Sequence, residues 1–212
     1  PGTNSILIKP VLRAHNQIKA SDIITVDMDE YMSANASQWS PDQQKGRVID
    51  APVPPRETML HVCTYQHRPD VNSVVHTHQL VATAIGVGGQ SIKPLYNQAL
   101  PFAPETPVYP KANLITDLTL GNEVAEYLGD RTALLLQGHG IMVVGESVDH
   151  AVSNTIYLER TAIMQVIAAI VGTPKALDPE YVASFAADWN RRAPHAYEYF
   201  RSLVPSLKAD AG

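Results

Sequence analysis

The sequence predicts one α/β domain in which helices cover a mixed or antiparallel central sheet. A chain of 212 residues with 45% hydrophobic residues is long enough for one large domain, and such a chain can bury about 70% of its unfolded surface. Short β-branched runs alternate with segments of helical periodicity along the chain. Several links between consecutive strands are too short for the crossover that parallel strands need, so we expect antiparallel pairs in the sheet.

The first part of the chain contains two short strands and one helix. Residues 5–8 and 23–26 are β-branched runs bounded by Pro, Asp and Gly, which is typical of buried strands. Residues 34–46 form a polar excursion. Pro55 suits the first turn of a helix, because the N–H that proline lacks would have no partner there. We therefore expect a helix over 56–67, which ends before the next proline.

The middle of the chain contains a strand with a polar end, a short helix and a proline-rich stretch. The strand covers 71–78, and its apolar part is followed at once by two histidines. The helix covers 79–85 and ends at a cluster of glycines. Residues 93–110 contain five prolines, which predicts a loop without regular structure.

The last part of the chain contains two strands and the longest helix. The strands, 133–136 and 141–144, are strongly apolar and are joined by a tight turn. A helix over 116–128 precedes them, with a threonine at its start as the N-cap. The longest helix covers 147–171 and is capped by its first serine. The segment 179–207 predicts two further helices.

The composition excludes several classes of protein. The chain has 16 Lys and Arg against 21 Asp and Glu, and a net charge of −5 argues against a nucleic-acid or anionic-membrane binder. The single cysteine, Cys63, excludes a disulfide framework and fits a reducing cytosol. No apolar run reaches the roughly 20 residues of a membrane span and no signal peptide is visible, so we expect a cytoplasmic protein. Because the chain begins at Pro1, we expect that an N-terminal segment of the natural protein is absent.

Three histidines are candidate metal ligands. His76 and His78 are two residues apart on a strand, so their side chains share one face. His139 lies at the turn between the two apolar strands, and its flanking glycines allow the backbone to twist and another group to approach closely. Three imidazoles at sheet ends form a site with an open coordination position, as in catalytic metal centres. The alternative is a set of edge and turn histidines that bind no metal.

A second group of polar residues lies at the start of the 56–67 helix. Glu57 either complements the helix dipole or serves as a general acid/base or fourth ligand. Arg56 would ordinarily be a solvated surface residue, and His61 follows Glu57 by four residues on the same helical face, as an orienting partner rather than a ligand. The remaining histidines lack such neighbours, and we expect them at the surface: His15, His67, His150 and His195.

Together, three motifs resemble those of the class II aldolase and adducin-head family. Residues 54–61 read PPRETMLH, residues 70–78 read DVNSVVHTH and residues 136–141 read LQGHGI. With the long helix that follows, the resemblance covers 5–171.

The resemblance implies a fold and a metal site. The fold is a single α/β/α domain over 1–212 with a mostly antiparallel central sheet. One divalent metal ion per subunit (Zn, Mn, Co or Fe) would be held by His76, His78 and His139, with Glu57 as the catalytic acid/base. Members of the family are typically homotetramers with active sites between subunits, which implies that C-terminal residues can complete a neighbour's site.

Departures from the family's sugar-phosphate members argue against a phosphorylated substrate. Those members carry Ser-Gly after the first strand and Ser-Ser before the catalytic Glu, where this chain has Lys-Pro-Val-Leu at 9–12 and Pro-Pro-Arg before Glu57. Arg56 instead offers a planar fork that matches a carboxylate. Aldolase-type members also place a tyrosine after the H-x-H strand; here Asn97 takes that position beside Tyr96, and both are candidate substrate contacts.

These features predict a metal-dependent lyase that decarboxylates a hydroxylated aromatic or heteroaromatic dicarboxylic acid, in the catabolism of aromatic compounds. In this hypothesis Arg56 holds a carboxylate, and Glu57 returns a proton to carbon after CO2 is lost. Retro-aldol cleavage of a non-phosphorylated hydroxy-keto acid is an alternative, which a catalytic Tyr96 would favour. A non-catalytic adducin-like interaction domain is a second alternative, against which the complete histidine set argues. We expect a small-molecule carboxylate substrate, a homotetramer and no nucleic-acid or membrane partner.

Overall fold

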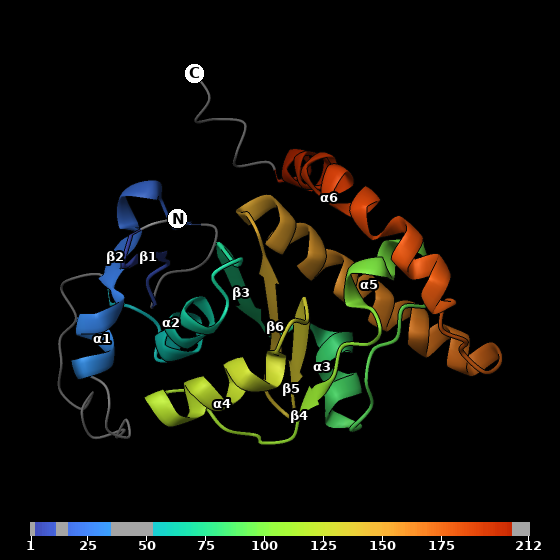
Figure 1. Cartoon of the computed structure of the whole chain (residues 1–212), viewed down its shortest axis with the longest axis horizontal. Coiled ribbons are helices and arrows are strands. Elements are labelled where there is room, and N and C mark those ends of the chain that lie inside the picture. The colour runs from blue at the N-terminus through green and yellow to red at the C-terminus, as the bar shows by residue number, and fades with distance from the viewer. Residues whose placement is uncertain (1–2, 12–16, 35–52, 205–212) are drawn as a thin grey trace. The chain divides into compact units, whose positions relative to one another are not determined.

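The computed structural model describes residues 3–11, 17–34 and 53–204, which divide into two compact units (Figure 1). The first unit takes its described residues from 1–69 and 114–127, and the second from 70–113 and 128–212. Each unit has its own hydrophobic core. The single domain that the sequence suggests over the whole chain stays a prediction.

The first unit is built on a two-stranded antiparallel sheet. Strand β1 (Ser5–Ile8) pairs with β2 (Ile24–Asp27), and α1 (Met28–Ala34) follows the sheet directly. A short 3-10 helix, η2 (Ala20–Asp22), precedes β2. The strands lie within one residue of the predicted bounds, but they are not fully buried, because Leu7 is 74% exposed between two buried isoleucines. A two-stranded sheet covers its core with one face only. The predicted polar excursion lies outside the described residues beyond Ala34.

Two helices complete the first unit, and both begin later than the sequence predicts. Helix α2 (Thr58–His67) begins two residues late, because the Pro55 carbonyl accepts hydrogen bonds from the backbone N–H and hydroxyl of Thr58 at 3.1 and 2.7 Å. Helix α4 (Leu118–Leu128) is capped by Asp117 rather than by the predicted threonine. The Asp117 carboxylate accepts a hydrogen bond from the Leu120 N–H at 2.9 Å.

The second unit contains a four-stranded mixed sheet in the order β3-β6-β5-β4. Strands β3 (Ser73–Thr77), β6 (Gly140–Gly145) and β5 (Ala133–Leu136) are antiparallel neighbours, and β4 (Val108–Tyr109) pairs with β5 in parallel. The expectation of a mixed, largely antiparallel sheet is confirmed. Buried side chains of the core include Ile92, Phe102, Leu135, Ile141, Val143 and Leu158.

Three helices pack in this unit. Helix α3 (Leu80–Val87) ends at the predicted glycines, and α5 (Val148–Val171) packs against β3, β6 and α3. Ser147 caps α5 as predicted, because its side chain accepts a hydrogen bond from the backbone N–H three residues on. The predicted pair of C-terminal helices is wrong, since α6 (Pro179–Ser202) is one helix that continues through Pro194. It packs along α5, where the Ala193 carbonyl accepts a hydrogen bond from the Ser153 hydroxyl at 2.9 Å.

The proline-rich stretch has more regular structure than the sequence suggests. It contains a 3-10 helix, η4 (Asn97–Phe102), and the short strand β4. Prolines lie before and after the strand and not within it, so they remove no backbone N–H donor from its pairing with β5. The carbonyl of Pro107 even accepts a hydrogen bond from the N–H of Leu135 on β5, at 2.9 Å. Among the described helices, none combines the length and apolar character that crossing a membrane requires.

Candidate metal centre

Three histidines from two parts of the second unit come together at one end of its sheet. His76 is on β3, His78 follows that strand, and His139 lies in the turn between β5 and β6. Their ligand atoms all lie within 4.8 Å of one another. The ring centroids are 4.9–5.2 Å apart. This spacing allows all three imidazoles to reach one metal ion.

The register of two strands creates this cluster. Strand β3 runs antiparallel to β6, and His76 lies opposite Met142 while Thr77 lies opposite Ile141. The end of β3 is therefore beside the start of β6, next to the turn that carries His139. The alternation of side chains along a strand directs His76 and His78 to the same face.

Two glycines flank His139, one shaping the turn and the other leaving space beside His78. Gly138 has a φ of +65°, a conformation that side-chain-bearing residues rarely adopt. A Cβ atom on Gly140 would lie 2.5 Å from Cδ2 of His78 and 2.6 Å from the Thr77 carbonyl oxygen. The sequence-based expectation that these glycines permit a turn and a close approach is confirmed.

A backbone carbonyl orients one of the imidazoles. Nδ1 of His76 lies 2.9 Å from the Ile141 carbonyl oxygen, which can only accept a hydrogen bond. Nδ1 therefore carries the proton, and the lone pair of Nε2 is available for a metal ion. His78 is exposed and the other two histidines are partly exposed, so a substrate can reach the cluster. The donor set fits a divalent metal ion with an open coordination position.

Sequence reasoning missed Glu159, which connects α5 to the segment that carries His78. The carboxylate of Glu159 accepts hydrogen bonds from the backbone N–H groups of Val81 and Ala82, at 2.9 and 2.8 Å. These are first-turn donors of α3, whose N-cap residue, Gln79, provides no side-chain cap. The absence of a Ser, Thr, Asp or Asn at this helix start was the available signal that a cap comes from elsewhere.

The predicted acid, cation and orienting histidine belong to the first unit. Glu57 is the N-cap residue of α2 rather than a first-turn residue, and its Oε1 atom accepts a hydrogen bond from the N–H of buried Ile115 at 2.9 Å. Arg56 is exposed beside it, and His61 is half-buried one turn along the helix. The roles assigned to these residues stay predictions.

Tyr96 and Asn97 contact the helices of the second unit. Tyr96 packs against the core beside α5, and burial raises the pKa of its hydroxyl, although a hydrogen bond with Thr161 opposes the change. Oδ1 of Asn97 accepts a hydrogen bond from the Tyr181 hydroxyl on α6 at 2.8 Å.

One of the four histidines predicted at the surface is buried. His150 is 7% exposed, with Nδ1 hydrogen-bonded to the Ser147 hydroxyl at 2.7 Å and Nε2 3.2 Å from a Glu146 carboxylate oxygen. It is buried because its place in the first turn of α5 folds the ring back over the capping residue. His67 and His195 are exposed as expected, and His15 lies outside the described residues.

Known proteins are similar to this chain in sequence or in fold. The family model described as "Class II Aldolase and Adducin N-terminal domain" matches residues 1–166. The 3,4-dihydroxyphthalate decarboxylase of Arthrobacter keyseri is 32% identical over 169 residues, which is 76% of this chain and 64% of that protein. The enzyme of the same name from Rhodococcus jostii is 31% identical over 159 residues, 71% of this chain and 65% of that protein. The chain thus spans just under two thirds of these relatives.

A solved structure agrees with the fold. The structure of L-fuculose 1-phosphate aldolase from Glaciozyma antarctica superposes with a TM-score of 0.74 at 18% identity, over 98% of this chain and 77% of that one. At this identity the likeness concerns the arrangement of helices and strands.

Proposed function

The chain belongs to the class II aldolase and adducin N-terminal domain family, and we propose that it is a metal-dependent lyase that decarboxylates a hydroxylated aromatic dicarboxylic acid. The observation that carries this proposal is the cluster of His76, His78 and His139, whose ligand atoms lie within 4.8 Å of one another. The relatives named 3,4-dihydroxyphthalate decarboxylase support decarboxylation of that substrate class.

The three imidazoles would hold one divalent ion, with Zn, Mn, Co and Fe as the candidates. Bound there, the ion would supply a Lewis acid that stabilises negative charge on a substrate oxygen as CO2 leaves. His76 contributes its Nε2 atom, because the Ile141 carbonyl holds the proton on Nδ1. Neutral imidazoles leave the full positive charge of the ion available for this stabilisation.

In this proposal Glu57 donates the proton that replaces the lost carboxylate. The Ile115 N–H donates to its Oε1 atom at 2.9 Å, which fixes one oxygen of the carboxylate. Arg56 binds a substrate carboxylate through its guanidinium fork, and His61 orients Glu57 from the same face of α2. Tyr96 and Asn97 stay candidates for substrate contacts.

The proposal is tested with the purified protein, loaded in turn with each candidate metal. The panel contains 3,4-dihydroxyphthalate, related hydroxylated aromatic dicarboxylates and hydroxy-keto acids, and release of CO2 and of carbonyl fragments is followed in the same samples. We expect CO2 without a carbonyl fragment, and no release after chelation. A carbonyl fragment without CO2 would replace the proposal with retro-aldol cleavage. No release from metal-loaded protein would contradict lyase action on these substrate classes, and the interaction domain would be tested next.

Glu57→Gln tests the proposed proton donor. The amide oxygen of Gln can still accept from Ile115, so the variant keeps the local hydrogen bond and loses only the acid. We expect turnover to fall by about 10²-fold or more, with metal content unchanged. Glu126→Gln, at an exposed position on α4, is the matched control and keeps full activity. Full activity of Glu57→Gln would exclude Glu57 as the acid.

We also propose that the protein assembles as a homotetramer. The second half of α5 supports an assembly, because its apolar side chains are 39–82% exposed at residues Ile163, Val166, Ile167, Ile170 and Val171. Such a contiguous apolar face is typical of protein contacts. Light scattering should give four times the chain mass, and Ile167→Lys should lower the measured mass. A monomeric wild-type protein would contradict this proposal.

A further inference from the structure

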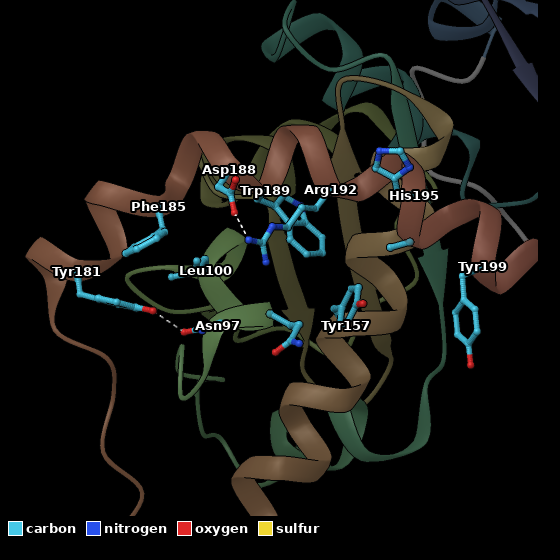
Figure 2. Close-up of a pocket in the computed structure, with 12 residues that line it drawn as sticks. Asn97, Leu100, Tyr157, Tyr181, Phe185, Asp188, Trp189, Arg192, His195 and Tyr199 are labelled. Atoms are coloured by element: carbon cyan, nitrogen blue, oxygen red, sulfur yellow. Dashed lines mark hydrogen bonds and ion pairs between the residues drawn. The ribbon is translucent and has the colours of Figure 1, made fainter.

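A second concave site lies in the second unit, away from the histidine cluster. It is a pocket of about 370 Å³ lined by residues of η4, α5 and α6 (Figure 2). None of the three clustered histidines is among its lining residues. Pockets of this size hold small organic molecules when their walls are apolar and a few polar groups converge on them.

The walls of the pocket are aromatic. The chain has nine tyrosines, three phenylalanines and two tryptophans, and five of these residues line this one pocket. In Figure 2 the side chains of Phe185 and Trp189 extend from α6 toward η4, and Tyr157 on α5 lies beside Trp189. Flat aromatic faces favour a planar ring as the ligand, through stacked or edge-to-face contacts.

Hydrogen bonds and ring contacts hold two of these walls in place. The Trp189 indole N–H donates to Oδ1 of buried Asn154 at 2.8 Å, and the indole contacts the Tyr157 ring edge-on with centroids 5.1 Å apart. Across the pocket, the Tyr181 hydroxyl donates to Oδ1 of Asn97 at 2.8 Å. Walls that are already ordered lose little conformational entropy when a ligand binds.

The polar side of the pocket contains one carboxylate and one guanidinium group, those of Asp188 and Arg192. Asp188 is the one acidic residue among the described lining residues, and it pairs with two arginines. Nη2 of Arg192 lies 2.6 Å from Oδ2 of Asp188, and Arg191 pairs with the other oxygen. The Arg192 side chain also lines the pocket and is 69% exposed, so its other N–H groups can donate to a ligand. Arg191 lies outside the pocket, so the exposed guanidinium group of Arg192 is the one that can pair with an anionic ligand there.

We propose that this pocket binds a planar aromatic carboxylate. The ring lies against Phe185, Trp189 and Tyr157, and the ligand carboxylate accepts hydrogen bonds from Arg192. The proposal does not depend on the lyase activity proposed above, although substrates and products of that reaction belong to the same chemical class. The chain would then hold such molecules at two places, one at the histidines and one beneath α6.

Trp189 provides a direct measurement of binding. Trp39 is the only other tryptophan and is changed to phenylalanine (Trp39→Phe). Emission excited at about 295 nm then reports on the pocket alone. Benzoate is the probe, and cyclohexanecarboxylate, which has the same charge without a planar ring, is the comparison ligand. We expect a saturable change in emission with benzoate and at least several-fold weaker binding of cyclohexanecarboxylate.

Three variants locate the site. Arg192→Gln removes the cation while Arg191 still pairs with Asp188, and we expect benzoate to bind about tenfold more weakly or worse. Phe185→Leu removes one flat wall and should weaken benzoate more than cyclohexanecarboxylate. Arg201→Gln, on the same helix but outside the pocket, is the matched control and should bind benzoate like wild type. Thermal unfolding of each variant shows that it is folded.

The same titration after chelation, and in His76→Ala, separates this site from the proposed metal centre. Unchanged benzoate affinity in both samples supports a separate pocket, whether or not the protein is a lyase. Loss of the signal in both would place the benzoate at the metal centre and overturn the proposal. A change in emission that does not saturate, or wild-type affinity in Arg192→Gln, would also overturn it.

Discussion

The candidate metal centre depends on single residues with little freedom to change. Nδ1 of His76 is hydrogen-bonded to the Ile141 carbonyl at 2.9 Å, which leaves Nε2 as its ligand atom. His78 lies against Gly140, where a Cβ atom would come within 2.5 Å of the imidazole. His139 follows Gly138, whose φ of +65° shapes the turn. The position of each histidine therefore depends on one neighbouring backbone group.

Alanine substitution tests each proposed ligand. We expect His76→Ala, His78→Ala and His139→Ala each to lower the affinity for Zn²⁺ or Co²⁺ by about 10²-fold or more, because two imidazoles make a poor site. Metal content after dialysis and the visible spectrum of the Co²⁺ protein provide the measurement. His67→Ala, at an exposed histidine of α2, should bind like wild type. Unchanged binding in any of the three variants would remove that residue from the site.

Gly140→Ala tests the space beside His78. The added Cβ would overlap the imidazole and the Thr77 carbonyl oxygen, at 2.5 and 2.6 Å, so either the ring or β6 has to shift. We expect metal affinity to fall by at least about tenfold, since small displacements of a ligand are costly. Gly172→Ala makes the same chemical change where nothing lies within 4 Å, and it should leave affinity unchanged. Equal affinities in the two variants would contradict this account.

At the scale of elements, the contact between α3 and α5 stabilises the segment that carries His78. Glu159 on α5 accepts two backbone hydrogen bonds from the start of α3, immediately after the H-x-H strand. A carboxylate at this position satisfies donors that would otherwise be unpaired and complements the helix dipole. The end of β3, the residues that carry His78 and the start of α3 are thereby connected to α5.

Glu159→Gln should affect both stability and metal binding. An amide can accept only one of the two hydrogen bonds and directs its own NH2 group at the other donor. We expect a loss of about 1–3 kcal/mol in the free energy of unfolding and roughly tenfold weaker metal binding. Asp178→Ala removes the side-chain cap of α6 and should cost about 0.5–2 kcal/mol without weakening metal binding. Equal metal affinity in both variants would show that Glu159 supports only the fold.

At the scale of the whole molecule, stability at alkaline pH depends on a buried thiol in the core of the first unit. Cys63 is fully buried, and burial raises its pKa from 9.0 to about 11, with the charge of Asp117 adding to the effect. Well below pH 9.0 the thiol is neutral in both the folded and the unfolded state, so this contribution to stability is complete. As the pH rises toward about 11, only the unfolded state ionises, and the contribution is lost.

Denaturant unfolding, measured from about pH 8 to about pH 11, tests this dependence. The free energy of unfolding of the wild type should fall more steeply with pH than that of Cys63→Ala, with the difference changing by up to about 2 kcal/mol. The half-buried Tyr31, whose pKa is also raised by burial, is present in both proteins and cancels in the comparison. Parallel curves for the two proteins would show that the thiol does not govern alkaline stability.

Local patterns in the sequence determined most elements and part of the site. Strands 5–8 and 133–136 match the structure at both ends, because periodic apolar residues and turn residues act over a few positions. Local patterns also predicted that Ser147 caps α5 and that His76 and His78 lie on one face, as the structure has them. The glycine-flanked turn between two apolar strands indicated the third histidine, and the family motifs predicted the decarboxylase-like relatives.

Only the tertiary structure decided which distant residues meet. The register between β3 and β6 brings His139 to the other histidines, and α5 supplies Glu159 to the start of α3. Packing against α5 accompanies the continuation of α6 through Pro194, and pairing with β5 produces a strand in the proline-rich stretch. These features depend on contacts between residues far apart in the chain, whereas propensity and spacing describe only neighbours in sequence. A helix start without a local cap therefore indicates a missing partner, and the fold determines that the partner is Glu159.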